Sequence, residues 1–182
     1  MKKIALIITD GFEEIEATTI VDVVRRATIG IDILALNDLH VTGARGVTIS
    51  ADYIFNYYTA KDYDGIVFAG GMANARELAQ TTDVLQLIQD YFSLGKLVAA
   101  ICASPALVLS AAGILEGKSA TCYPDDGLVS SMSSANYIDA PVVLDGNLIT
   151  GQSPATAMEF ALEIVKYMGE DSNRVAMDLL GK

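Results

Sequence analysis

One cysteine stands where a buried strand is followed at once by a helix. From Ala99 to Pro105 the chain reads Ala-Ala-Ile-Cys-Ala-Ser-Pro, an apolar run that leads directly into residues typical of a first helical turn. A residue at so sharp a turn is pushed out of the sheet, as in nucleophile elbows. We expect the free amides and dipole of the helix N-terminus to lower the pKa of Cys102. The pattern therefore favours a reactive thiol, and the alternative is a small buried apolar residue.

Three acidic residues follow the first apolar run of the chain. Glu13 and Glu14 are expected to face solvent and to complement the dipole of the helix that starts there. Glu16 stands close to Ala17 and Ile20 in the sequence, so its side chain can point inward. A buried carboxyl beside a thiolate must have a raised pKa, because two adjacent anions repel each other. Glu16 is therefore predicted to be protonated and to donate a hydrogen bond to the sulfur.

Gly70 and Gly71 follow a third apolar strand. They can be an ordinary turn that needs a positive φ. The functional interpretation is that Gly71 presents an unobstructed N–H, which with the amide of Ala103 forms an oxyanion-type pocket.

Alternating strands and helices must position these residues. We predict strands at 3–8, 31–36, 65–69 and 97–101, hairpins at 41–50 and 142–150, and helices at 13–27, 82–92, 104–112, 153–168 and 172–180. This alternation predicts a doubly wound, mostly parallel α/β sheet in one domain over 1–182. Such sheets bind ligands at the carboxyl ends of their strands, where all these candidate residues are expected.

Composition excludes several classes of function. The 182 residues carry 12 basic and 23 acidic side chains, a net charge of −11, which argues against a nucleic-acid or anionic-membrane partner. A single histidine, His40, excludes a multi-histidine metal site, so no metal or cofactor is expected. Residues 97–115 lack charge, but Pro105 and Gly113 interrupt them, so a membrane helix is the less favoured interpretation. Two cysteines and the lack of a signal-like start predict a cytoplasmic protein.

Four motifs in order resemble one family over essentially the whole chain. They are GFEEIEA, FAGGMANARELA, AAICASPALVL and GQSPATAMEFAL. Together they closely resemble the DJ-one/ThiJ/PfpI superfamily, above all its DJ-one-like branch, which includes a protein associated with parkinsonism. The resemblance implies a flavodoxin-like sandwich with a cysteine nucleophile elbow, and usually a homodimer.

The resemblance also implies roles for individual residues. Cys102 would be the easily oxidised thiol and Glu16 its protonated partner, while the amides of Gly71 and Ala103 would surround the sulfur and its sulfinate form. Further pocket positions and dimer-interface positions are implied: Gly70, Tyr123 and Pro154 for the pocket, Asp22 and Arg26 for the interface.

Two departures from the family pattern bear on mechanism. Peptidase-like members carry histidine directly after the nucleophile, where this chain has Ala103, so a Cys-His peptidase is not supported. Many DJ-one-like members also have a Thr-His-Pro segment, where this chain has Cys122, Tyr123 and Pro124. Tyr123 can form a hydrogen bond but is a poor base at neutral pH. Cys122 is either a resolving thiol or, as we favour, a buried strand residue.

Two functions remain open and share the same residues. The first is cofactor-independent processing of small reactive aldehydes or glycated groups, a glyoxalase-like or deglycase-like activity in carbonyl stress. The second is a redox sensor or stress chaperone without turnover, in which Cys102 oxidises to the sulfenic and sulfinic acids. A hydrolase is less favoured because of Ala103.

Overall fold

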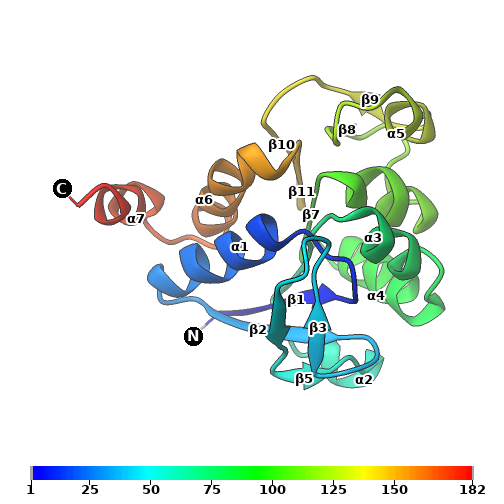
Figure 1. Cartoon of the computed structure of the whole chain (residues 1–182). Coiled ribbons are helices and arrows are strands. Elements are labelled where there is room, and N and C mark those ends of the chain that lie inside the picture. The colour runs from blue at the N-terminus through cyan, green and yellow to red at the C-terminus, as the bar shows by residue number, and fades with distance from the viewer. Residues whose placement is uncertain (1, 182) are drawn as a thin grey trace.

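The computed structural model describes residues 2–181 and centres on one seven-stranded sheet. Its strands lie in the order β10-β11-β7-β6-β1-β2-β5 (Figure 1). Their bounds are β1 (Lys3–Ile8), β2 (Gly30–Ala35), β5 (Tyr53–Ile54), β6 (Gly65–Phe68), β7 (Leu97–Ile101), β10 (Val142–Asp145) and β11 (Leu148–Gly151). Only the β10–β11 pair of this sheet is antiparallel. The predicted doubly wound, mostly parallel α/β architecture is confirmed.

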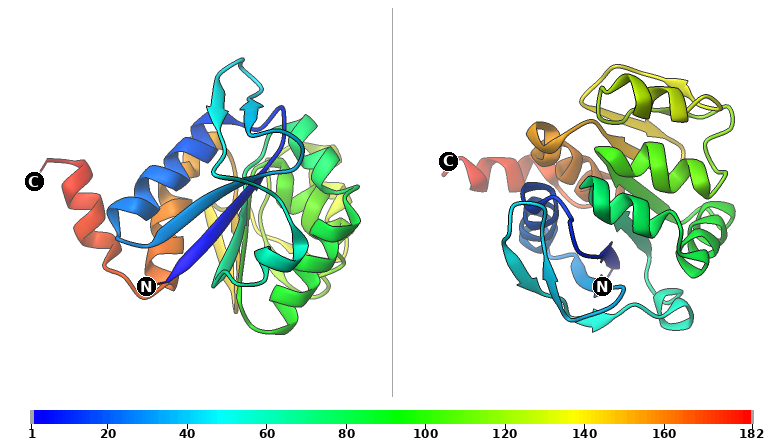
Figure 2. Two further views of the ribbon diagram at one scale, coloured as in Figure 1. Left: turned by 90° about the horizontal axis from the view of Figure 1, so that it is seen from below. Right: turned by 45° about the vertical axis from the view of Figure 1, so that its right-hand side comes forward.

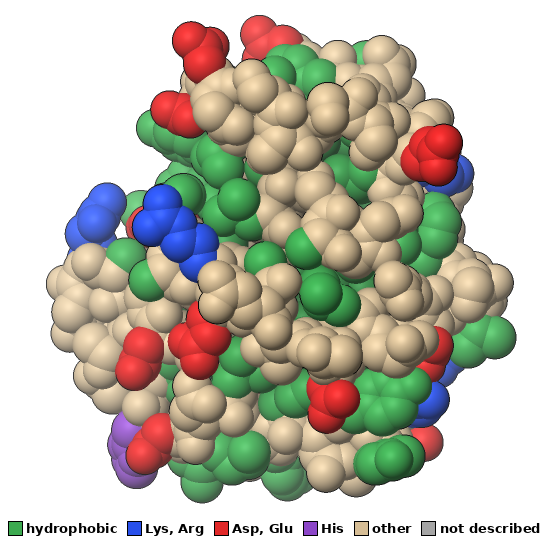
Figure 3. Space-filling model, turned by 90° about the vertical axis from the view of Figure 1, so that its right-hand side faces the viewer, with side chains coloured by type: hydrophobic (Ala, Val, Ile, Leu, Met, Phe, Trp, Pro, Cys, Tyr) green, Lys and Arg blue, Asp and Glu red, His purple; other side chains and the backbone are tan. Residues whose placement is uncertain are grey.

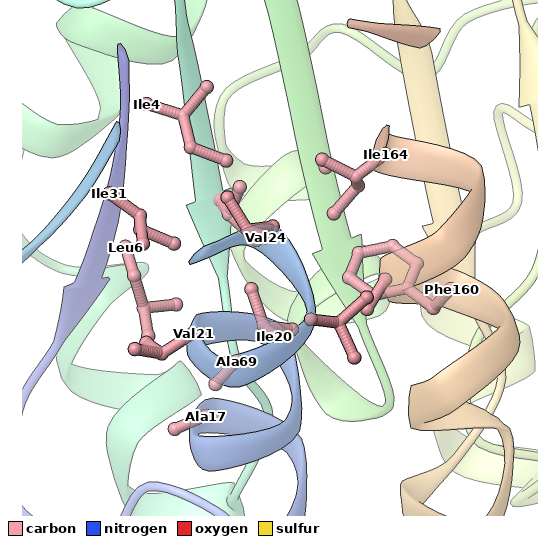
Figure 4. Packing of buried hydrophobic residues seen from close by; sticks show 14 of the residues in the cluster. Ile4, Leu6, Ala17, Ile20, Val21, Val24, Ile31, Ala69, Phe160 and Ile164 are labelled. Atoms are coloured by element: carbon pink, nitrogen blue, oxygen red, sulfur yellow. The ribbon is translucent and has the colours of Figure 1, made fainter. Parts of the chain in front are cut away.

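Helices cover both faces of the sheet (Figure 2). One face carries α1 (Glu14–Arg26), α6 (Ala157–Tyr167) and α7 (Ser172–Leu179), and the other carries α2 (Tyr57–Ala60), α3 (Met72–Leu78), α4 (Thr82–Ser93) and α5 (Asp126–Ser131). The central strands are apolar on both sides because each side is covered. In Figure 4, Ile20 and Val24 of α1 and Phe160 and Ile164 of α6 belong to one apolar cluster, which also includes Ile4 of β1.

Two short pairs of strands lie outside the main sheet. The antiparallel hairpin of β3 (His40–Thr42) and β4 (Thr48–Ser50) agrees with the hairpin predicted for 41–50. The parallel pair of β8 (Ser119–Ala120) and β9 (Asn136–Tyr137) was not predicted. These two-residue strands have no periodicity long enough to be recognised in the sequence.

Several helix boundaries differ from the sequence prediction. Helix α3 was not predicted, because its run after the glycine turn is only seven residues long. Thr82 and Asp83 were expected to cap α4, but Thr81 is the N-cap residue and makes no side-chain capping bond. The last long helix is preceded by a 3₁₀ turn, η2 (Pro154–Thr156), as expected of a proline at a helix start.

The surface fits the acidic composition. On the face in Figure 3, Asp and Glu side chains are scattered among uncharged groups, and Lys and Arg side chains form no extended patch. Across residues 2–181, none of the helices combines the length and the apolar character that a bilayer span requires.

Candidate functional site

Cys102 lies at a strained turn between β7 and the following helix. Its φ is +65°, in the left-handed region that a residue with a Cβ rarely adopts. The helix begins at Ala103 and includes a π-helical turn, η1 (Pro105–Leu109), with proline in its first turn. The elbow is held on both sides, because Cys102 N donates to Gly151 O at 3.0 Å and Tyr123 N donates to Cys102 O at 2.8 Å. The predicted strand–cysteine–helix junction is therefore present.

Glu16 is fully buried on the first turn of α1 and lies against Cys102. Its Oε2 accepts a hydrogen bond from Gly70 N at 2.6 Å, and its carboxyl group also contacts the Cys102 thiol. Its other oxygen, Oε1, is buried and has no hydrogen-bond partner within residues 2–181. A cysteine and a carboxyl that the sequence separates widely are thus brought into direct contact.

The glycine turn completes the surroundings of the sulfur. Gly71 has a φ of +89° and precedes α3, and the amides of Gly71 and Ala103 both donate toward Cys102. A Cβ on Gly71 would lie 2.1 Å from Gly11 O, and one on Gly70 would lie 2.7 Å from Glu16 Oε2. Glycine is therefore required at position 71 by conformation and by space, whereas a side chain at position 70 would crowd Glu16 and Cys102.

The raised pKa of Glu16 agrees with the sequence prediction, whereas the pKa of Cys102 does not. Burial raises the pKa of Glu16 to about 7, while the hydrogen bond from Gly70 lowers it. Burial and then the Glu16 carboxylate raise the pKa of the Cys102 thiol, and the amides of Ala103 and Gly71 oppose them. The expected lowering of the thiol pKa was therefore wrong in direction, because the strand–helix pattern does not reveal desolvation. Near neutral pH, Glu16 stands between its two protonation states beside a thiol.

The sulfur opens into a cleft of about 660 Å³. The lining residues are Gly11, Glu13, Ala44, Arg45, Gly71, Met72, Ala73, Cys102, Ala103, Tyr123, Asp125, Leu128 and Pro154. Tyr123 and Pro154 thus lie where the family resemblance implied, whereas Gly70 lies beneath the cleft against Glu16. Arg45, Asp125 and Met72 were not identified from the sequence, since an isolated arginine in a hairpin carries no recognisable pattern.

Glu14 holds the hairpin that brings Arg45 to the cleft. Its side chain is buried, and Oε1 accepts from Arg45 N at 2.6 Å and from Val47 N at 3.3 Å. These amides lower the pKa of Glu14 against the opposing effect of burial. The expectation that Glu14 lies on a solvated face was wrong, because the β3–β4 hairpin folds over the start of α1.

The second cysteine lies in a different environment. Cys122 is fully buried in the apolar cluster beneath α3 and α4, whereas Cys102 packs against the cluster on the opposite face of the sheet. The Cys122 thiol lies 3.4 Å from Tyr123 O, and burial raises its pKa to about 11. The burial that the sequence interpretation favoured is confirmed, but Cys122 lies just after β8 (Ser119–Ala120) and not in a strand.

Other candidate residues lie away from the cleft. Asp22 and Arg26 form an exposed ion pair on α1, with 2.9 Å between Arg26 Nε and Asp22 Oδ2. His40 is exposed near Asp38 on the hairpin and does not line the cleft. Among residues 2–181, no group of three or more His, Cys, Asp or Glu side chains is arranged to hold a metal ion.

Several proteins are similar to the chain in sequence over most of its length. It is 38% identical to the protein dj-1beta of Drosophila melanogaster, over 99% of this chain and 98% of the relative. It is 33% identical to a deglycase of Pyrococcus horikoshii, over 70% of this chain and 76% of the relative. It is 39% identical to the DJ-1 homolog B of Arabidopsis thaliana over 90% of this chain, but the match spans only 37% of that longer protein.

Solved structures agree with these sequence relationships. The crystal structure of Drosophila melanogaster DJ-1beta matches with a TM-score of 0.92 and 36% identity, covering 98% of this chain and 97% of the other. The structure of oxidized DJ-1 from Toxoplasma gondii matches with a TM-score of 0.91 and 29% identity, covering 99% and 98%. The model of the DJ-1/PfpI family matches residues 2–167. With its elbow cysteine and these relatives, the chain belongs to the DJ-1/PfpI family.

Proposed function

We propose that this protein converts small reactive carbonyl compounds, or the adducts they form on other molecules, without a cofactor. The observation that supports this proposal is the contact between Cys102 and Glu16, together with the amides of Gly71 and Ala103, which are directed at the sulfur. A nucleophile, an adjacent proton carrier and two fixed donors are the parts that carbonyl addition needs. The relative named deglycase supports the same class of chemistry.

The reaction would begin with addition of the thiol to an aldehyde such as methylglyoxal. The sulfur forms a bond to the aldehyde carbon while Glu16 takes the thiol proton. Glu16 then passes that proton to the former carbonyl oxygen, which becomes the hydroxyl group of the hemithioacetal. A Glu16 pKa of about 7 suits this task, because a base is most useful when its pKa is near the working pH. The two amides would stabilise the negative oxygen as it forms.

An internal proton transfer would complete the chemistry without any net oxidation. Glu16, again ionised, removes the proton from the former aldehyde carbon and returns it to the neighbouring ketone carbon. The hydroxyl group of the hemithioacetal passes its proton to the ketone oxygen, so the first carbon becomes the carbonyl of a thioester on Cys102 and the second carries the hydroxyl group. Water then cleaves the thioester, releasing a 2-hydroxy acid and the free thiol. The overall change adds one water to a 2-oxoaldehyde, so no electron donor or acceptor is needed.

The cleft also bears on the choice of substrate. Its volume of about 660 Å³ exceeds what a three-carbon aldehyde fills, so a glycated side chain can also enter. The Arg45 side chain at the cleft would attract the oxygens of a dicarbonyl or a carboxylate. Both features support small aldehydes and glycated groups as substrates.

The experiment is turnover of methylglyoxal by the reduced protein, measured as lactate formed beyond one equivalent. Any free thiol traps one equivalent of aldehyde, so aldehyde loss alone is not informative. Cys102→Ser and Glu16→Gln are expected to abolish multiple turnover, whereas Cys122→Ser serves as the matched cysteine control and retains it. Turnover that survives Cys102→Ser would refute the proposal.

A redox sensor or stress chaperone is the second candidate. The amides of Gly71 and Ala103 that would stabilise an oxyanion can equally hold a sulfinate on Cys102, and a related structure is that of an oxidized DJ-1. A chain that forms no lactate but whose Cys102 reacts rapidly with peroxide would favour this function.

We also propose that the chain acts as a homodimer. The support is the family resemblance, which assigns Asp22 and Arg26 to the interface, together with exposed apolar residues Ile15 and Val47 near the start of α1 and on the hairpin. Sedimentation equilibrium of the wild type and of Ile15→Asp tests this, and a monomeric wild type at micromolar concentration would refute it.

A further inference from the structure

Asn74 is a fully buried amide on the first turn of α3. Its Oδ1 accepts a hydrogen bond from Thr9 N at 2.8 Å, which identifies the other end of the amide as the NH₂ group. That NH₂ group donates to Ala69 O at 2.9 Å and to Gly70 O at 3.1 Å. All three bonds of the Asn74 side chain are therefore made to the main chain at the carboxyl ends of β1 and β6.

The two carbonyl groups that Asn74 contacts belong to the two peptide groups that serve the site. The Ala69–Gly70 peptide donates its N–H to Glu16 Oε2 at 2.6 Å. The next peptide, Gly70–Gly71, directs its N–H toward the sulfur of Cys102. A trans peptide group is planar, so a donor that fixes its oxygen also fixes the direction of the N–H on the opposite edge. One side-chain amide thus orients both donors.

The glycine turn needs such support because it has no side chains of its own. Within residues 2–181, two further donors reach these carbonyl oxygens: Ser104 Oγ donates to Ala69 O at 2.6 Å and Glu13 N donates to Gly70 O at 3.1 Å. Each of them reaches one oxygen, whereas Asn74 reaches both. Donation to a carbonyl oxygen also polarises its peptide group, which strengthens the bond made by the N–H on the other edge.

We propose that Asn74 is a positioning residue that holds the two glycine-turn amides on Glu16 and Cys102 and thereby sets how the pair shares its proton. This inference rests on the proposed function for its purpose, but its test needs no turnover. Loss of the amide frees both peptide groups to rotate, which weakens the bond from Gly70 N to Glu16 and the donation from Gly71 N to the sulfur.

The test is the rate of Cys102 alkylation by iodoacetamide between pH 5 and pH 9. Ionised Glu16 accepts the thiol proton, so the rate is expected to rise with pH through the Glu16 titration. A hydrogen bond to the charged carboxylate favours ionisation, so its weakening in Asn74→Ala moves the midpoint to higher pH. We expect an upward shift of about half to one pH unit, with alkylation at pH 6 slower by about three- to tenfold.

Asn147→Ala is the matched control. The Asn147 amide also bridges two main-chain carbonyls, Phe92 O at 3.2 Å and Lys96 O at 2.8 Å, but at the amino-terminal end of β11. It should cost similar stability and leave the alkylation profile unchanged. Ser104→Ala removes one of the two side-chain donors onto Ala69 O and leaves Gly70 O untouched, so it should shift the midpoint by less than Asn74→Ala. It provides the test if Asn74→Ala does not fold.

The other charged groups at the site remain in place in all three variants. They are Glu13, which raises the pKa of Glu16, and Arg45 and Asp125 in the cleft. A profile of Asn74→Ala or Ser104→Ala that coincides with the wild type would overturn the proposal, as would an equal shift in Asn147→Ala. If the wild type forms no lactate but these shifts occur, the proposed function fails and the positioning role stands.

Discussion

Gly70 offers a direct test of the contact between Cys102 and Glu16. In Gly70→Ala the added Cβ would lie 2.6 Å from Cys102 Cβ, 2.7 Å from Glu16 Oε2 and 3.1 Å from Cys102 Sγ. The conformation of Gly70 is not left-handed, so the backbone tolerates alanine and the whole effect comes from crowding. The methyl group must therefore push apart the two side chains that we propose to react together.

The size of the effect follows from these distances. Non-bonded heavy atoms of this kind prefer about 3.5–4.0 Å, so the pair must open by roughly 1 Å. A misplacement of about 1 Å can cost about a hundredfold in rate. Overpacking of a tight core costs about 1–3 kcal/mol, which lowers the melting temperature by roughly 2–4 °C per kcal/mol at this chain length.

Lactate formation and thermal unfolding, measured side by side, separate the two effects. Gly65→Ala is the matched control, because its Cβ would lie 2.8 Å from Leu97 Cβ at the opposite end of β6. Gly65→Ala is expected to lose similar stability and to keep its turnover within about twofold, since its crowding is far from the cysteine. If Gly70→Ala keeps wild-type turnover, or if Gly65→Ala loses as much, the reasoning about the pair is refuted.

Three further outcomes are expected. The pKa of Glu16 is raised from 4.5 to about 7, so between these pH values the folded chain keeps a proton that the unfolded chain releases. The free energy of unfolding should therefore fall by about 3 kcal/mol as pH rises from about 4.5 to about 7. In urea unfolding, Glu16→Gln should lose this pH dependence. Arg45→Ala should raise the KM for methylglyoxal about three- to tenfold with little change in kcat, and a fall confined to kcat would contradict a binding role. One equivalent of peroxide should oxidise Cys102 and spare buried Cys122, as peptide mass spectrometry will report; equal oxidation of both would contradict the difference in exposure.

The central architecture could be predicted because it depends on local patterns. The apolar run of β1, the turn at Asp145–Asn147 and the stripe of α6 each carry their own periodicity or turn residues. Cys102 could be identified because a strand, a small residue and a helix start lie within a few positions of one another. Such features need no knowledge of distant parts of the chain.

Only the tertiary structure decided the burial and the hydrogen bonds of the residues around the site. Of the two acidic residues on the first turn of α1, Glu16 was expected to point inward and Glu14 to face solvent. The structure buries both, because Glu14 accepts hydrogen bonds from the hairpin amides. The direction of the Cys102 pKa likewise depends on burial and on a carboxylate from another element. Asn74 reaches the site through carbonyl oxygens, which every residue carries and no sequence pattern marks. Hydrogen bonding and desolvation depend on distances between segments, and folding alone sets those distances.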